Sequence, residues 1–252
     1  MYHKLLSLCF GIFILHCTAS AEEVHIGTVV SSINALNEII HLFEKNSPND
    51  KVIVHNENLV SAFIYKQIKE KNDLDILVSG NIAIPLQLEN EGLTVKNARF
   101  TYVFGKLVLW SRNPKLVDTK GSVLITGGFR NIALLDSKLA PYGTAAEQVL
   151  AKLGVWDKVQ SKLVILENSG EMQKQVMEGT IDLAFIPLAT LNPSKKVEGS
   201  LWIIPKNYYE PIEQQAVLLK RAENNAAAKA FFNYLKSPQA RNVFEKYGFS
   251  VP

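Results

Sequence analysis

The alternation of apolar runs with helical patterns in the second half of the chain is the strongest constraint on its fold. Strands are predicted there at residues 131–136, 162–167 and 182–187. The apolar centres at 132–135 and 183–186, like the one at 76–78 earlier in the chain, are continuous, which is typical of strands that are buried on both faces. Helical patterns lie between them, near residues 143–153 and 170–178. This β-α-β-α-β series predicts a parallel sheet covered by helices, and therefore an α/β fold.

The rest of the chain continues this alternation. Apolar residues recur at helical spacing from 36 to 43, from 228 to 235 and from 240 to 247, which predicts amphipathic helices. The 252 residues are enough for one large domain or two smaller ones, and no linker rich in Pro, Gly or Ser separates any two parts. Further strands are predicted at residues 24–30, 51–55, 74–79, 106–111, 201–205 and 215–220.

Residues 1–21 have the pattern of a removable export signal. Lys4 precedes an apolar run at residues 5–15 that is too short to span a bilayer, and a small-x-small cleavage site ends at Ala21. We expect cleavage after Ala21. An uncleaved membrane anchor is one alternative, and a lipid on Cys17 is another, although His16 is larger than the residue that normally precedes a lipid-modified cysteine.

Cysteine usage agrees with export to a bacterial periplasm. Both cysteines, Cys9 and Cys17, lie within the predicted signal. The mature chain therefore contains no disulfide and no thiolate chemistry, unlike a small disulfide-dense secreted domain.

Composition and motifs disfavour several classes of function. The formal net charge of +3 comes from 27 basic and 24 acidic residues without a basic cluster, which argues against a nucleic-acid partner. His25, His41 and His55 are the histidines of the mature chain, and they lack the spacing of a zinc site. No GxSxG, Walker-type or GxGxxG motif occurs, and no nucleophile, base and orienting group come together. We therefore expect neither an enzyme nor a metal-ligating site.

Small or hydroxyl residues recur where a predicted strand passes into a helix. Ser31 and Ser61 precede helices in the first half of the chain, and Tyr142 and Ser169 lie at such junctions in the second half. Ligands of open α/β sheets bind beyond the carboxyl ends of the strands, where helix N-termini offer N–H groups to anions. Each serine alone would be explained as a helix cap, but the four junctions together indicate one shared anion site.

The sequence resembles the periplasmic molybdate-binding proteins of ABC importers over nearly the whole mature chain, and the resemblance includes these junctions. The central and C-terminal blocks of the resemblance are specific, and the N-terminal block is looser. The matching blocks are Ser31 with NAL at 34–36, QI at 67–68, LDILVS at 74–79, LAPYGTAA at 139–146, LGVWDKV at 153–159, SKLV at 161–164, AVLLK at 216–220, SPQA at 237–240 and YGF at 247–249.

The resemblance implies a type II periplasmic binding protein, with two Rossmann-like lobes, mixed and mostly parallel sheets, and two crossovers. Lobe one would comprise residues 22–103 plus 206–252, and lobe two residues 104–205. A tetrahedral oxyanion would lie between the lobes, held by hydroxyls and backbone N–H groups without a cofactor or a metal ligand.

Carried over by position, the resemblance assigns two contacts to each lobe. Ser31 and Ser61 would bind the oxyanion from lobe one, and Tyr142 and Ser169 from lobe two, largely through backbone N–H groups. The implied function is the capture of molybdate or tungstate by a periplasmic monomer, and its delivery to an inner-membrane ABC permease. Hinge closure would trap the anion.

Two departures from the family pattern keep other ligands open. Pro187 stands where one branch of the family has a tyrosine hydroxyl, and proline has no N–H to replace it. Leu59 and Val60 precede Ser61, where small polar residues are usual. The alternatives are another oxyanion, a small organic acid or, in a different class, an extracytoplasmic hydrolase or transferase.

Overall fold

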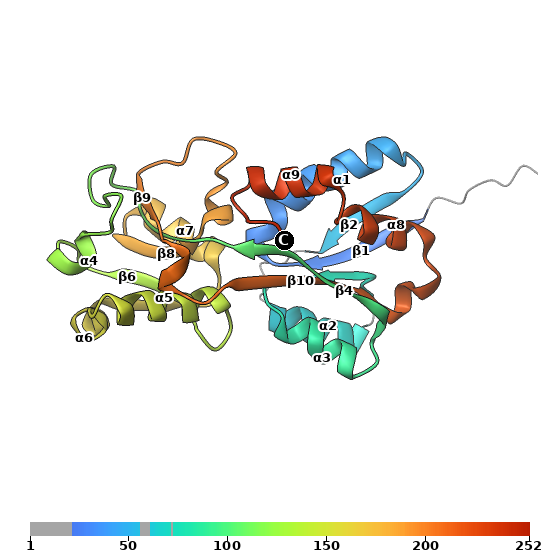
Figure 1. Ribbon diagram of the computed structural model, residues 1–252, viewed down its shortest axis with the longest axis horizontal. Coiled ribbons are helices and arrows are strands. Elements are labelled where there is room, and N and C mark those ends of the chain that lie inside the picture. The colour runs from blue at the N-terminus through green and yellow to red at the C-terminus, as the bar shows by residue number, and fades with distance from the viewer. Residues whose placement is uncertain (1–21, 56–60, 72) are drawn as a thin grey trace, which may run out of the picture.

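The computed structural model describes residues 22–55, 61–71 and 73–252, and the predicted export signal lies outside them. The chain forms two lobes that lie side by side, each built on a five-stranded sheet (Figure 1). The predicted α/β fold is confirmed. Among the described residues, no helix combines the length and the apolar character needed to cross a membrane.

Lobe one contains a mixed sheet in the order β2-β1-β3-β10-β4. Strands β1 and β3 pair in parallel, whereas β10 runs antiparallel to both of its neighbours. The strands are β1 (Glu23–Thr28), β2 (Lys51–His55), β3 (Ile76–Val78), β4 (Thr94–Gly105) and β10 (Ile212–Leu219). The helices are α1 (Ile33–Asn46), α2 (Ser61–Lys71), α3 (Ala83–Asn90), α8 (Ala226–Tyr234) and α9 (Pro238–Lys246).

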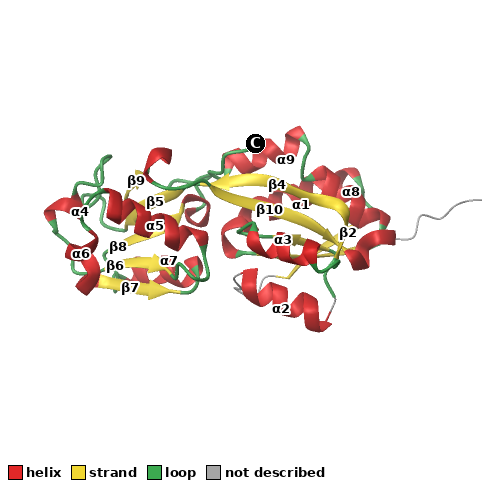
Figure 2. Ribbon diagram, turned by 60° about the horizontal axis from the view of Figure 1, so that its bottom comes forward, coloured by secondary structure: helices red, strands yellow, loops and turns green. Residues whose placement is uncertain are grey.

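The apolar residues of this sheet divide between its two faces, because successive side chains of a strand point to opposite sides. On β3, Ile76 and Val78 pack in one core cluster with α1, α8 and α9. Leu77 lies between them in sequence and packs in the other cluster with Ile64 of α2. Figure 2 shows the helices on both sides of the sheet. The continuous apolar run therefore reflects burial on both faces, as predicted.

Lobe two contains the β-α-β-α-β series predicted from sequence. Its sheet has the order β7-β6-β8-β5-β9, with β6 parallel to both β7 and β8. The strands are β5 (Leu107–Ser111), β6 (Ile132–Leu135), β7 (Leu163–Leu166), β8 (Leu183–Pro187) and β9 (Ser200–Ile203). The helices are α4 (Val123–Thr126), α5 (Pro141–Lys152), α6 (Trp156–Val159) and α7 (Ser169–Glu178).

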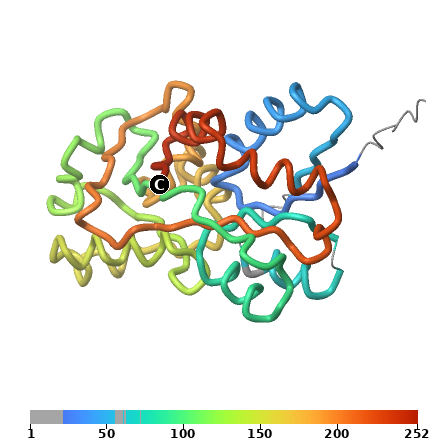
Figure 3. The backbone as a smooth tube through the Cα atoms, turned by 45° about the vertical axis from the view of Figure 1, so that its right-hand side comes forward, coloured from blue at the N-terminus to red at the C-terminus, as the bar shows by residue number. Residues whose placement is uncertain are grey.

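The chain crosses between the lobes twice. It passes directly from β4 to β5 through Lys106, and it returns from β9 to β10 through a 3-10 turn at Lys206–Tyr208. Figure 3 traces both connections. The boundaries predicted at 103/104 and 205/206 lie beside these crossings, although Ile212, which was assigned to lobe one, packs in the core of lobe two.

Sequence reasoning missed β4 and began β10 at residue 215 instead of Ile212. The first half of β4 carries Lys96 and Arg99 and has no apolar run, while its second half, residues 100–104, is rich in aromatic residues that sequence reasoning overlooked. It forms because it pairs antiparallel with β10 along most of its length. Strand β10 likewise begins with polar residues that interrupt its apolar pattern, namely Glu213, Gln214 and Gln215. Both errors concern the strands that lead into the crossings.

Candidate functional site

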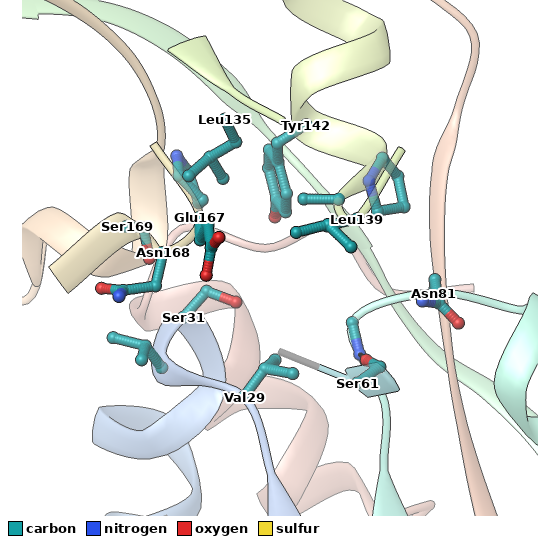
Figure 4. A pocket seen from close by; sticks show the side chains of 15 residues that line it. Val29, Ser31, Ser61, Asn81, Leu135, Leu139, Tyr142, Glu167, Asn168 and Ser169 are labelled. Carbon is teal, nitrogen blue, oxygen red and sulfur yellow. Dashed lines mark hydrogen bonds between the residues drawn. The ribbon is translucent and has the colours of Figure 1, made fainter. Parts of the chain in front are cut away.

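All four predicted site residues line one cavity between the lobes, as Figure 4 shows. Ser31 and Ser61 reach it from lobe one, and Tyr142 and Ser169 from lobe two. The cavity has a volume of about 50 Å³. A water-sized group needs about 10–15 Å³ of such space, so the cavity accommodates roughly three to five groups of that size. This capacity suits a small ion with a few oxygen atoms.

The lobe-one wall consists of two junctions that follow strands. Ser31 belongs to a 3-10 turn, Val30–Ser32, which begins one residue after β1 and has no side chain that caps its N-terminus. Ser61 begins α2, and its Oγ lies 3.1 Å from Oγ of Ser79 and accepts a bond from the N–H of Gly80 at 3.3 Å. The hydroxyls of Ser61 and Ser79 thus form a buried polar pair beside the end of β3.

Gly80 and Asn81 also line the cavity, and sequence reasoning missed them. The signal was present, because Ser79, Gly80 and Asn81 follow β3 in the same junction pattern. Asn81 lies just before α3, and its Oδ1 accepts from the N–H of Ile84 in the first turn at 3.1 Å. Its side chain therefore has a structural role beside the cavity.

In lobe two, the first turn of α5 presents a backbone donor. The preceding residue, Ala140, offers no side-chain cap, and Pro141 has no N–H. The N–H of Gly143 donates to the Ala140 carbonyl at 2.9 Å, whereas the N–H of Tyr142 has no acceptor within the described part of the chain. Gly143 allows α5 to begin against β6, because a Cβ at this position would collide with the carbonyl oxygen of Leu135.

Helix α7 contributes the second donor group of lobe two. The side chain of Asn168 caps this helix by accepting from the N–H of Glu171 at 2.8 Å. Ser169 is buried, and its Oγ accepts a bond from the hydroxyl of Thr190 at 3.1 Å. The hydroxyl proton of Ser169 is therefore available to an acceptor in the cavity.

The hydrogen-bond donors that line the cavity are neutral. No Lys, Arg or His is among the described residues that line it. Burial raises the pKa of the Tyr142 hydroxyl far above its usual range, so this group stays protonated. Helix N-termini carry partial positive charge, and uncapped N–H groups bind anions there. The geometry can thus hold an oxyanion through hydrogen bonds alone.

Glu167 is a feature of the site that sequence reasoning missed. This exposed residue lines the cavity, and Figure 4 shows its carboxylate directed towards Ser31 across the cavity. A carboxylate accepts hydrogen bonds and repels an anion. Its position follows β7 directly, but nothing in the local sequence indicates that its side chain faces the opposite lobe.

The two departures noted in the sequence have different outcomes. Pro187 ends β8 and lines the cavity, where it contributes apolar surface and no N–H donor. Leu59 and Val60 lie outside the described residues.

The histidines lie apart from this cavity. Nδ1 of His25 lies 2.9 Å from Nε2 of His55, on neighbouring strands of lobe one. No group of three or more His, Cys, Asp or Glu within the described ranges is arranged to hold a metal ion.

The chain is similar to known bacterial binding proteins over nearly its whole length. Residues 26–250 match the family described as "Bacterial extracellular solute-binding protein". The chain is 36% identical to the molybdate-binding protein ModA of Azotobacter vinelandii over 98% of its own length and 97% of that protein. It is 35% identical to ModA of Rhodobacter capsulatus, over 92% of this chain and 89% of that protein.

A solved structure shows the same similarity. The periplasmic molybdate-binding protein of Azotobacter vinelandii superposes with a TM-score of 0.82 at 35% identity, and the match covers 91% of this chain and 99% of that one.

Proposed function

The chain belongs to the bacterial extracellular solute-binding protein family, and on this basis we propose that it captures molybdate between its lobes for an ABC importer. The observation that carries the proposal is the convergence of Ser31, Ser61, Tyr142 and Ser169 on one small cavity whose described lining contains no cationic side chain. Relatives that match nearly the whole chain are named for binding molybdate. Tungstate, with the same charge and shape, is the expected second ligand.

Binding would proceed by closure of the two lobes around the anion. Hydroxyls of lobe one and N–H groups of lobe two replace the water around its oxygens, so the bound anion stabilises only the closed arrangement. Hydrogen bonds to a charged group contribute roughly 1.5–3 kcal/mol each. Because molybdenum–oxygen bonds are longer than sulfur–oxygen bonds, a cavity fitted to molybdate holds sulfate less well.

The site requires no cofactor and no metal ligand, since molybdate is bound as an intact oxyanion. We further propose that the protein is exported, cleaved after Ala21 and active as a monomer in the periplasm, where it delivers the anion to an inner-membrane permease. We assign it no enzymatic activity and no nucleic-acid partner.

Calorimetric titration tests the ligand. The protein, purified from the periplasmic fraction and freed of ligand, is titrated with molybdate, tungstate, sulfate and phosphate. We expect dissociation constants well below micromolar for molybdate and tungstate, and much weaker binding of the other two. Absence of binding by both molybdate and tungstate would contradict the proposal. N-terminal sequencing of the same sample should begin at Glu22.

One observation favours a second candidate, an organic anion. A hollow of about 290 Å³ adjoins the cavity, and Lys138 is among the residues that line it. Asn81, Leu139, Ala140 and Pro141 line both spaces. The hollow could receive the organic part of a phosphate monoester or carboxylic acid whose anionic group lies in the cavity. Stronger binding of a simple phosphate monoester than of molybdate would support this alternative.

A further inference from the structure

A chain of buried hydrogen bonds joins the two walls of the cavity. Oγ of Ser32 lies 2.9 Å from the hydroxyl of Tyr102, which donates to Oε1 of Gln214 at 2.8 Å. At its other end, Nε2 of Gln214 donates to the hydroxyl of Tyr142 at 3.0 Å. The four side chains are buried, and Gln214 is 0% exposed. The bonds therefore form in a site from which water is excluded.

The two ends of this series of hydrogen bonds lie next to the groups that we propose bind the anion. Ser32 follows Ser31 in the turn after β1, and Tyr142 carries the uncapped N–H of α5. Tyr102 lies on β4 and Gln214 on β10, the two strands that lead into the crossings between the lobes. Ser32, Tyr102 and Gln214 are absent from the lining of the cavity.

The position of the Tyr142 hydroxyl is tightly determined. Gly105, the last residue of β4, leaves room for it, because a Cβ there would overlap the hydroxyl oxygen. Burial raises the pKa of both Tyr102 and Tyr142, so neither hydroxyl ionises and both remain donors and acceptors. A buried polar group that loses its hydrogen-bond partner raises the free energy of the protein. This series of hydrogen bonds therefore favours one arrangement of the two lobes.

We propose that Gln214 is a positioning residue for ligand binding. This proposal rests on the proposed function, in which lobe two closes on an anion held by lobe one. Gln214 does not touch the ligand. Its amide holds the Tyr142 hydroxyl at the hinge, so that the N–H of Tyr142 meets an anion that Ser31 also binds.

Gln215 provides a matched control. It is the next residue of β10, 8% exposed, and its amide donates to Oγ1 of Thr101 at 3.3 Å and accepts from Arg99 at 2.7 Å. These partners all belong to lobe one. Gln215→Leu thus removes a buried amide from the same strand without disturbing a bond between the lobes.

Affinity for molybdate is measured by calorimetry, and stability by thermal unfolding. Gln214→Leu should weaken molybdate binding roughly tenfold, whereas Gln215→Leu should lower the unfolding midpoint without a comparable change in affinity.

Tyr142→Phe keeps the ring and serves as a second, milder variant with the same expected loss of affinity. The double variant should lose little more than either single one, because both remove the same bond. Equal affinity losses for the two glutamine variants, or additive losses in the double variant, would overturn the proposal.

A measurement without ligand separates this proposal from the proposed function. The mature chain has no cysteine, so spin labels can be placed by Lys66→Cys on α2 and Lys174→Cys on α7, both exposed. In the ligand-free protein, Gln214→Leu should broaden the distribution of distances between the labels, and Gln215→Leu should not. An unchanged distribution would refute the positioning role whether or not molybdate binds, while failure of the wild type to bind molybdate would refute only the ligand.

Discussion

Thr190 donates its hydroxyl to Ser169 across 3.1 Å, and both side chains are buried, Ser169 at the lobe-two wall of the cavity. The bond uses an acceptor site of Ser169 and leaves its proton for the ligand. Ser169→Ala should therefore weaken molybdate binding about ten- to hundredfold, from the roughly 1.5–3 kcal/mol of a hydrogen bond to a charged group. Calorimetry measures the change. If affinity is unchanged, Ser169 acts only within lobe two.

The two serines of lobe one should differ in their effect on stability. Ser31→Ala and Ser61→Ala are each expected to lower molybdate affinity by a similar factor of about ten to a hundred. Ser61→Ala also removes the acceptor of the Gly80 N–H, so it should lower the free energy of unfolding more than Ser31→Ala does. Calorimetry and denaturant unfolding of the ligand-free variants check both expectations. Unchanged affinity in both variants would contradict a role of these two hydroxyls in binding the anion.

Removing the charge of Glu167 should strengthen the binding of dianions. The carboxylate lines the cavity and repels an oxyanion, although its exposure allows solvent and salt to screen the effect. We expect Glu167→Gln to raise molybdate affinity severalfold at low ionic strength and less at high ionic strength. Glu178→Gln, at the exposed far end of α7, is the control. Weaker binding by Glu167→Gln would contradict this repulsion and show that the carboxylate instead orients donor groups of the cavity.

Gly143 should be required for the position of the α5 N-terminus. A Cβ there would collide with the Leu135 carbonyl, whereas a Cβ at Gly128 would meet nothing within 4 Å. Gly143→Ala is expected to lower the free energy of unfolding by about 1–3 kcal/mol and to weaken molybdate binding, because the Tyr142 N–H is displaced. Gly128→Ala should leave both nearly unchanged. Denaturant unfolding and calorimetry compare the two, and equal behaviour would contradict the steric argument.

Acid should weaken the contact between α2 and α3. Hydrogen bonds from Lys69, and then from Tyr65 and Gln87, lower the pKa of Glu91 from 4.5 to about 2. A carboxyl whose folded pKa is depressed stabilises the fold above its unfolded pKa, and this contribution is lost as the pH falls. The window for Glu91 is therefore between pH 4.5 and about 2. Thermal unfolding against pH should show a shallower fall in this window for Glu91→Gln, and an unchanged slope would exclude the contribution.

The sequence by itself determined the class of fold and the places where a ligand would be held. Helical and strand periodicities are local properties, so the series from β6 to β8 could be predicted from the apolar runs alone. The junction residues follow from the same order, because the carboxyl ends of parallel strands meet at one edge of a sheet. The order of strands and helices therefore suffices to predict one shared site for the four junction residues Ser31, Ser61, Tyr142 and Ser169.

The tertiary structure alone decided how the hinge is built and which other groups reach the cavity. The polar first half of β4 has no apolar run and joins the sheet through the pairing of this strand with β10, which lies more than a hundred residues away in sequence. The bond between Gln214 and Tyr142, and the direction of Glu167 across the cavity, depend likewise on contacts between distant segments. Such contacts leave no periodic signal, because they arise only when the packing of both lobes brings polar groups together and removes water from them.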